Sequence, residues 1–381
     1  MKSDTAFDQQ PKAHLNTLPA TINDALIDDD RRERLWERWV TWRSARSTNT
    51  VRAVLFDISV FAGWARKNGH RPLPARPESV SLYLEEEASK GLAVATIERR
   101  ASSISTLHRL AEERSPCDDE LVSWRLSGIR RANGKSQRQA HPLRIKGDVE
   151  DIEHSSPNGL SLLSILAFLD DEIAGASKTT NVAERTRICR HAMRDAALFC
   201  VAYDAGLRAS ELVRVLNDHV TTAPGGGGEL FLPLSKTDAE GEGSFRYLSE
   251  RTLKRLSSWL GAAGIKEGPV FVGIKRSGML NKSAIAPDTV GRIFKKRVEQ
   301  YFRSRKDNPF LPLTPEEINI VKSISGHSGR IGVCQDAFAA GEDIGGIMRD
   351  FDWKSSRMPI RYARKLSARS GAASRLHKKT Q

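Results

Sequence analysis

The most informative stretch of this sequence, residues 326–365, reads GHSGRIGVCQDAFAAGEDIGGIMRDFDWKSSRMPIRYARK. His327 and Arg330 stand three residues apart at the start of a segment that is predicted to be a helix ending near Gly341, so their side chains share one helix face. The amino terminus of a helix favours anions, because its main-chain N–H groups are unpaired there. Trp353 follows, and Tyr362 stands nine residues after it. The stretch therefore predicts an anion-binding site at His327 and Arg330, followed in the chain by the indole of Trp353 and the hydroxyl of Tyr362.

Two further motifs come earlier in the chain. GLRASEL, residues 206–212, places Arg208 and Glu211 at a break between two helical segments. Lys236 lies at the turn of the one clear β signal, a strand over 229–234, a turn over 236–243 and a return strand over 244–248. Each motif is weak by itself, since Arg-x-x-Glu is usually an ordinary surface ion pair and His-x-x-Arg arises by chance. Their joint presence requires a common chemical explanation.

Attack on a DNA phosphodiester gives such an explanation. Negative charge builds up on two non-bridging oxygens, and planar guanidinium groups such as Arg208 and Arg330 match that geometry with paired hydrogen bonds. Lys236, on a mobile hairpin, can protonate the leaving 5′ oxygen. Tyr362, with an ordinary pKa of about 10, becomes a nucleophile when cationic neighbours and a base activate it. Trp353 can donate its indole N–H to the phosphate.

In their order along the chain, these residues resemble the signature of the tyrosine recombinase (phage integrase) family, which reads Arg, Lys, His-x-x-Arg, His or Trp, then Tyr. The series here is Arg208, Lys236, His327, Arg330, Trp353 and Tyr362. GLAV with TI over 91–97, and LHR over 107–109, are also similar to the family's amino-terminal domain. The resemblance spans about residues 32–376. It implies an enzyme that cuts and rejoins DNA at specific sites through a covalent 3′-phosphotyrosine, with no metal, cofactor or ATP, and with Glu211 supporting Arg208.

Three features depart from the family pattern. Gly329 stands where many members carry a larger apolar residue, and Phe351-Asp352 stand where a Gly-Gly pair is common. Residues 145–190 are expanded. The change at Phe351-Asp352 makes the backbone conformation next to Trp353 less predictable, and it affects the chemistry less.

The bulk composition is typical of a protein that binds nucleic acid. Sixty Lys and Arg against 47 Asp and Glu leave a net charge of +13, which favours a polyanionic partner, with solubility alone as the bland alternative. Four scattered cysteines fit a reducing cytoplasm and predict neither a disulfide framework nor a zinc site. The start of the chain is polar and no apolar run approaches a membrane span, so we expect a cytoplasmic protein without a membrane partner.

Helical periodicity and breaker residues predict a mainly α fold of two domains. Residues 1–30 are expected to be a loose tail, 31–133 an all-helical DNA-binding domain, 134–142 a polar linker and 143–381 a mostly helical catalytic domain with one small antiparallel sheet. The resemblance implies that the two domains clamp double-stranded DNA. It also implies that a dimer binds each inverted-repeat site, that four protomers hold two sites, and that a carboxy-terminal helix docks into a neighbour. Residues 372–379, with Leu376 as anchor, are the candidate for that helix, and a frayed end is an equal alternative.

Base recognition is expected in both domains. The resemblance places three arginines of the amino-terminal helices at the major groove, namely Arg52, Arg99 and Arg100, where an arginine reads guanine with two hydrogen bonds. A helix over 288–303 offers Arg292, Lys295 and Lys296 on its polar side. For each residue a phosphate contact or plain solvation is nearly as good an interpretation.

Two other functions use the same features. A DNA-binding protein that has lost catalysis is disfavoured because every catalytic position is filled. Strand relaxation of the topoisomerase type shares the chemistry and cannot be separated by sequence. The remaining tyrosines, Tyr83, Tyr203, Tyr247 and Tyr301, lie at periodic or strand positions and are expected in the core.

Overall fold

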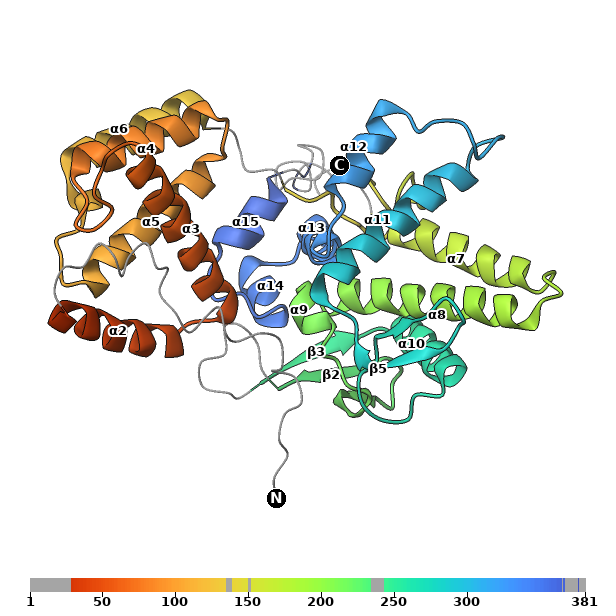
Figure 1. The fold of residues 1–381 in the computed structure, drawn as a ribbon. Coiled ribbons are helices and arrows are strands. Elements are labelled where there is room, and N and C mark those ends of the chain that lie inside the picture. Colours follow the sequence, from red (N-terminus) through yellow and green to blue (C-terminus); the bar gives the residue numbers. More distant parts are fainter. Residues whose placement is uncertain are drawn as a thin grey trace, which may run out of the picture. The chain divides into compact units, whose positions relative to one another are not determined.

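The chain forms two compact units, Met1–Arg138 and Gln139–Gln381, in a computed structural model (Figure 1). The structure describes residues 29–134, 139–149, 152–233 and 243–364, together with residues 366 and 376. The boundary between the units falls within the stretch 134–142 that the sequence predicts as a linker.

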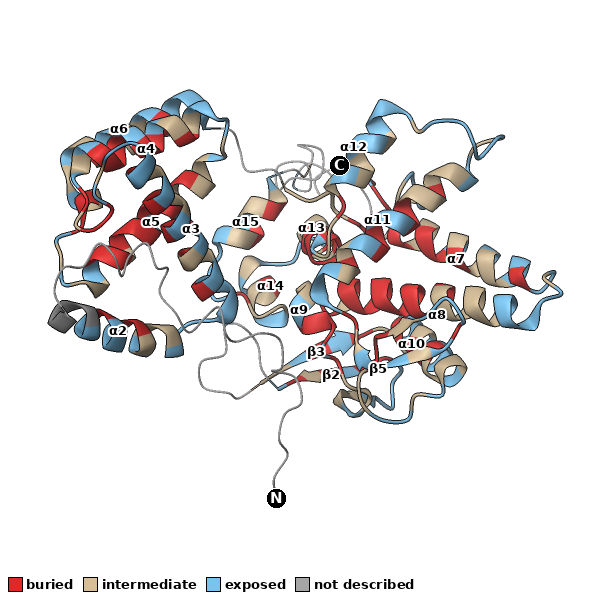
Figure 2. Cartoon of the chain, in the orientation of Figure 1, coloured by how far each residue is buried: buried red, intermediate tan, exposed pale blue. Residues whose placement is uncertain are grey.

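The first unit is built from helices alone within its described residues. They are α2 (Asp29–Ser44), α3 (Thr48–Lys67), α4 (Pro77–Ser89), α5 (Val94–Leu110), the short 3-10 helix η2 (Pro116–Asp118) and α6 (Glu120–Asn133). Apolar residues at helical spacing on α3, α4 and α5 face one another, and Phe61, Tyr83 and Ile104 are fully buried between them (Figure 2). A second cluster around Trp39 and Ile58 joins α2 to α3. Burial of these faces, not helix propensity, supplies most of the stability of such short helices.

The second unit is organised around a long central helix, α8 (Val182–Asp204). Its carboxy-terminal half is buried on every side, and α7 (Leu162–Ala176), α10 (Glu250–Ala263) and α13 (Ser328–Ala340) pack against it. The remaining helices are α9 (Ala209–Leu212), η3 (Asn217–His219), α11 (Pro287–Ser304), α12 (Pro315–Ser323), α14 (Ile344–Asp350) and α15 (Arg357–Ala363). The helix predicted to open at His327 and to end near Gly341 is confirmed, because His327 and Gly341 are its two caps.

Two small antiparallel sheets complete this unit. The first has the order β1 (Val220–Thr222), β2 (Gly228–Leu232) and β3 (Ser244–Leu248), with Leu230 opposite Arg246. The second pairs β4 (Val272–Ile274) with β5 (Leu280–Ala284). The predicted fold class, mainly helical with a small antiparallel sheet, is confirmed. Strands β1, β4 and β5 were not predicted from the sequence, because strands of three to five residues carry too little alternation to be recognised.

Helix α13 packs unusually close to its neighbours. A Cβ at Gly329 would lie 3.0 Å from the main chain of Ala202 on α8, and one at Gly332 would overlap the carbonyl oxygen of Leu143. This explains the glycine at 329, since a larger residue would push α13 off α8. Asp336 then anchors the helix by accepting hydrogen bonds from Arg144 Nε (2.6 Å) and the Tyr203 hydroxyl (2.6 Å). The residues at the start of α13 are therefore held on a rigid support.

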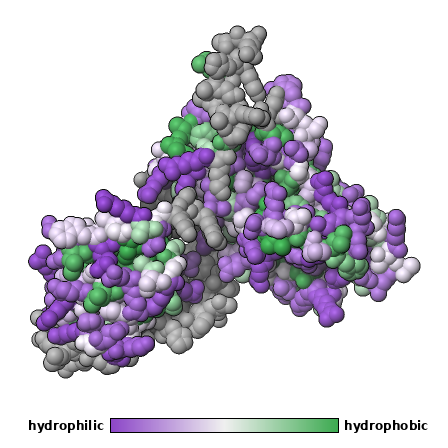
Figure 3. Space-filling model, turned by 90° about the horizontal axis from the view of Figure 1, so that it is seen from above, coloured by the Kyte–Doolittle hydropathy of each residue, from purple (hydrophilic) through white to green (hydrophobic). Residues whose placement is uncertain are grey.

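Hydrophilic side chains predominate on the face of the molecule seen in Figure 3. None of the helices in the described ranges combines the length and the apolar character that a membrane span needs.

Candidate active site

Arg330 lies at the centre of the candidate site. It is 2% exposed, its Nη1 donates to the Gly206 carbonyl, and its Nη2 donates to the Phe351 carbonyl at 3.2 Å. The guanidinium also faces the Trp353 ring, 4.4 Å from the ring centroid. Burial, reinforced by the positive charge of Arg208, lowers the pKa of Arg330 to about 10. The side chain thus stays cationic at neutral pH and is held from three directions.

Arg208 is held by Glu211. The buried carboxylate of Glu211 accepts from the main-chain N–H of Arg208 (2.8 Å) and from its Nη1 (2.6 Å). About a quarter of the Arg208 side chain is exposed, so this guanidinium keeps access to solvent. A Cβ at Gly326 would lie only 2.9 Å from Cβ of Ala209. This close approach brings the start of α13, which carries His327, next to Arg208 at the start of α9.

His327 shares this positively charged environment. Although the residue lies at the surface, partial burial of its ring and the charges of Arg330 and Arg208 lower the pKa of His327, and Glu211 opposes the shift. The imidazole is consequently neutral at pH 7, and a neutral imidazole has one nitrogen free to accept a proton.

Tyr362 lies on α15 beside Trp353. The two rings meet edge to face with centroids 6.0 Å apart, and the main-chain carbonyl of Tyr362 accepts a hydrogen bond from Gln335 Nε2 (2.9 Å). Only 9% of the residue is exposed. Burial raises the pKa of Tyr362, and the charges of Arg330 and Arg208 partly counter it. The phenol is protonated at neutral pH and requires a proton acceptor before it can attack phosphorus.

The structure brings Arg208, His327, Arg330, Trp353 and Tyr362 into one site, although the first and the last are 154 positions apart in the sequence. Lys236 lies outside the described residues, and so does the predicted helix 372–379 apart from Leu376 alone. Within the described ranges, no group of three His, Cys, Asp or Glu side chains is placed to hold a metal ion.

The other tyrosines are mostly placed as expected. Tyr83, Tyr203 and Tyr301 are buried, whereas Tyr247 is 65% exposed, so the expectation of a core position for Tyr247 is wrong. The reason is the sheet: β3 turns Arg246 and Leu248 inward and leaves Tyr247 exposed on its outer face.

The predicted DNA-reading arginines of the first unit lie in three different environments. Arg52 is exposed on α3. Arg99 is partly exposed, and its guanidinium is held 2.5 Å from the buried carboxylate of Asp57. Arg100 is buried, pairs with Glu87 and donates to the Tyr83 hydroxyl at 3.0 Å. The prediction that Arg100 reads a base in the major groove is therefore corrected, because a guanidinium enclosed in the core is not free to reach a base.

In the second unit, Arg292, Lys295 and Lys296 are all exposed on α11, as predicted for its polar side. The opposite face of the helix buries Val290, Phe294 and Val298 in the core. The three cations thus lie on the solvent side of a well-packed helix.

Sequence reasoning missed Arg246, a buried arginine on β3 that acts electrostatically on Arg330 and Arg208. Its ion pair with Asp352 spans 3.9 Å. One signal was available: strand alternation places residue 246 on the same face as the apolar Leu248, and an arginine there is unusual.

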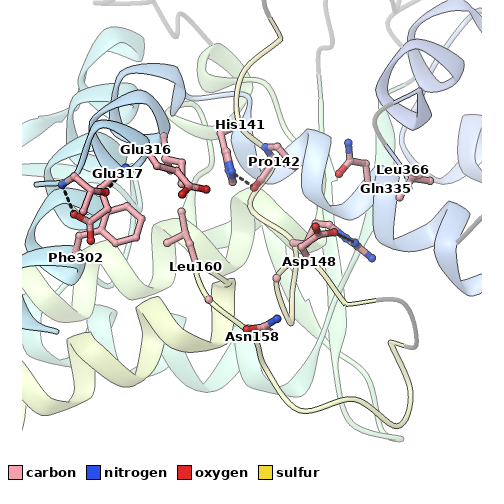
Figure 4. A pocket seen from close by; sticks show the side chains of 15 residues that line it. His141, Pro142, Asp148, Asn158, Leu160, Phe302, Glu316, Glu317, Gln335 and Leu366 are labelled. Atoms are coloured by element: carbon pink, nitrogen blue, oxygen red, sulfur yellow. Dashed lines mark hydrogen bonds and ion pairs between the residues drawn. The ribbon is translucent and has the colours of Figure 1, made fainter. Parts of the chain in front are cut away.

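A separate cavity of about 620 Å³ lies between α11, α12 and the segment 141–160 (Figure 4). Three carboxylates, those of Asp148, Glu316 and Glu317, are among its lining, and Leu160 and Phe302 supply apolar surface. Gln335, which holds the Tyr362 carbonyl, also borders it. The cavity therefore combines acidic and apolar surface.

The chain is similar to several known proteins. Residues 35–115 match the family described as phage integrase, N-terminal SAM-like domain. Recombinase cre of Escherichia phage P1 is 26% identical over 94% of this chain and 96% of its own length. An integrase/recombinase xerD homolog of Selenomonas ruminantium is 28% identical over 90% of this chain and 88% of its own length. The crystal structure of XerH site-specific recombinase in a post-cleavage complex with palindromic difH has the same fold, with a TM-score of 0.55 at 13% identity, covering 94% of this chain and 90% of that one.

The chain is thus similar to proteins named recombinase and integrase along about nine tenths of its length, and its first unit matches the amino-terminal domain of phage integrases.

Proposed function

We propose that this protein is a site-specific DNA recombinase that cleaves and rejoins strands through a covalent bond between Tyr362 and a 3′ phosphate. The convergence of Arg208, His327, Arg330, Trp353 and Tyr362 carries the proposal. The relatives named recombinase support the same activity.

Cleavage begins when the Tyr362 oxygen attacks the scissile phosphorus. We assign His327 as the acceptor of the phenolic proton, because its lowered pKa keeps it neutral at pH 7. Arg208 and Arg330 bind the two non-bridging oxygens, whose charge grows in the transition state, and Trp353 adds an indole N–H donor. Positive charge around the phosphate also stabilises the tyrosinate as it forms.

The bond from phosphorus to the 5′ oxygen breaks as the bond to Tyr362 forms. We assign Lys236 to protonate that oxygen, which leaves as a free 5′ hydroxyl. A 5′ hydroxyl from another strand then attacks the phosphotyrosine and releases Tyr362. Because the phosphodiester energy is kept in the covalent bond, neither ATP nor a metal is needed in this scheme.

We propose that the partner is double-stranded DNA with inverted repeats, bound by a dimer at each site and by a tetramer when two sites meet, in the cytoplasm. XerH in the solved complex is bound to a palindromic substrate. The tail beyond residue 370 contains Arg375, Lys378 and Lys379 around Leu376. The acidic and apolar cavity described above has complementary chemistry, which supports docking of this tail into a neighbouring protomer.

The proposal is tested with sites selected from a random duplex library by binding and cleavage. Wild-type protein should form a covalent DNA complex, and peptide mapping should locate the adduct on Tyr362. Tyr362→Phe should bind the same DNA without forming the complex. Joined products from two sites would indicate recombination, whereas relaxation alone would indicate topoisomerase activity and an adduct on Tyr247 would overturn the assignment.

A further inference from the structure

A buried arginine lies beside the proposed catalytic residues without a role in the scheme above. Arg246 is 5% exposed, and its Nη1 donates to the neighbouring Phe245 carbonyl at 2.8 Å. Within the part of the chain that the structure describes, its buried Nε–H has no hydrogen-bond partner. An enclosed guanidinium with so few hydrogen bonds is unfavourable for stability. A buried group of this kind requires an explanation, and function is one.

The carboxylate of Asp352 faces Arg246 with the opposite charge. Oδ2 of Asp352 lies 3.9 Å from Nη2 of Arg246, and Oδ1 lies 3.3 Å from Nζ of Lys354. Asp352 has a positive φ of 52°, in the left-handed region that residues with a Cβ rarely adopt. The carboxylate is thus attached to a strained position in the turn between α14 and α15, and the charge of Arg246 favours the conformation that points it toward β3.

The turn that contains Asp352 supplies two of the groups that hold Arg330. The preceding residue, Phe351, accepts from Arg330 Nη2 through its carbonyl, and the following residue, Trp353, places its ring against the guanidinium. The Phe351 ring also packs against Gly206, whose carbonyl accepts from Arg330 Nη1. A shift of the turn would therefore move the ring and the carbonyl together and release Arg330.

We propose that Arg246 is a positioning residue: its charge holds the Asp352 carboxylate, and the turn 351–353 thereby holds Arg330 in the orientation that binds the scissile phosphate. The inference rests on the proposed function, since it concerns the cleavage step. Arg246 acts through Asp352 and does not touch DNA. At the positions where Gly-Gly is common in the family, this chain has Phe351-Asp352. The strained Asp352 is paired with the buried Arg246 on β3.

The test measures the single-turnover rate of Tyr362 adduct formation, and separately the DNA affinity, on one selected site. Arg246→Met keeps the length of the side chain and removes its charge. Small displacements of a catalytic group reduce rates up to about 100-fold, so we expect about a 10- to 100-fold slower rate with DNA affinity nearly unchanged. Asp352→Ala should be similarly slow, whereas Asp352→Gly should stay close to wild type, because glycine adopts a positive φ without strain.

The decisive comparison is Arg246→Met combined with Asp352→Gly. If Arg246 acts through Asp352, the double variant should cleave as fast as Asp352→Gly alone, since the two effects are coupled. An equal rate loss from Arg246→Met in both backgrounds would overturn the proposal and assign Arg246 to direct phosphate contact. If Arg246→Met does not fold, Arg246→Lys, which keeps a charge near Asp352, should cleave nearly as well as wild type, and a large rate loss there would contradict the idea.

A matched control separates positioning from general stability. Arg297 is equally buried, and its Nε pairs with Asp195 at 2.6 Å in the core of the same unit. Arg297→Met should lower the melting temperature without changing the cleavage rate of the folded protein. An equal rate loss in the control would overturn the special role of Arg246. Absence of any adduct with wild-type protein would instead refute the proposed function itself.

Discussion

The guanidinium of Arg330 lies 4.4 Å from the centroid of the Trp353 ring, and this contact gives Trp353 two separable roles. The ring face stabilises a buried cation, and the indole N–H is a hydrogen-bond donor for DNA. The two roles respond differently to substitution.

Trp353→Phe keeps an aromatic face for Arg330 and removes the N–H. We expect slower cleavage with nearly normal thermal stability. Trp353→Ala leaves a cavity in a buried cluster and should lower the free energy of unfolding by about 3–5 kcal/mol as well. Chemical denaturation and single-turnover cleavage distinguish the two, and equal stability of both variants would contradict the packing role.

Replacement of Arg208 or Arg330 by lysine should not preserve cleavage. Loss of one charged donor at such a site typically reduces the rate about 100- to 1000-fold. An ammonium group is a point charge and cannot make the forked contact of a guanidinium. Single-turnover cleavage with saturating protein measures the effect apart from binding. A lysine variant that cleaves at nearly the wild-type rate would refute the clamp.

Lys236→Ala tests protonation of the leaving group. A substrate with sulfur at the 5′-bridging position leaves readily without a proton. The variant should be slow on normal DNA and close to wild type on the sulfur substrate. Equal impairment on both substrates would assign Lys236 to binding or positioning.

Arg52→Ala should affect DNA recognition, whereas Arg100→Ala should affect the stability of the fold. Arg52 is exposed, so its loss should weaken binding by about 1–3 kcal/mol and relax preference at one base pair if it reads a base. Loss of Arg100 leaves the buried Glu87 with the half-exposed Lys90 as its cation and should lower the free energy of unfolding by about 3 kcal/mol. Site selection and denaturant titration measure the two effects. A change in base preference with Arg100→Ala at unchanged stability would reverse our assignment.

Stability should fall in acid because of His191. Burial, together with the charges of Arg194 and Arg297, lowers the pKa of His191 from 6.5 to about 4. Between these values the unfolded chain binds a proton that the folded protein does not, so unfolding becomes easier as the pH falls from about 6.5 to about 4. The loss should be on the order of 2 kcal/mol. His191→Asn should flatten the dependence in urea titrations, and an unchanged slope would contradict the shift.

The sequence by itself determined the helical fold class and the set of candidate catalytic residues. Helix α13 begins and ends where predicted, because capping and apolar periodicity depend on residues within a few positions of one another. The order Arg208, His327, Arg330, Trp353 and Tyr362 is likewise written in the chain. Phosphate chemistry restricts which residue types can serve it, so their identity alone predicted a common site.

Only the tertiary structure decided which charged and aromatic side chains lie inside. Arg100 is on the same helix as Arg99, yet one guanidinium is enclosed by Glu87 and the other stays partly exposed. Tyr247 is exposed because its side of β3 is uncovered. The contact between Arg246 and Asp352 joins residues 106 positions apart. Burial depends on how distant faces pack against each other, and local sequence patterns do not contain that information.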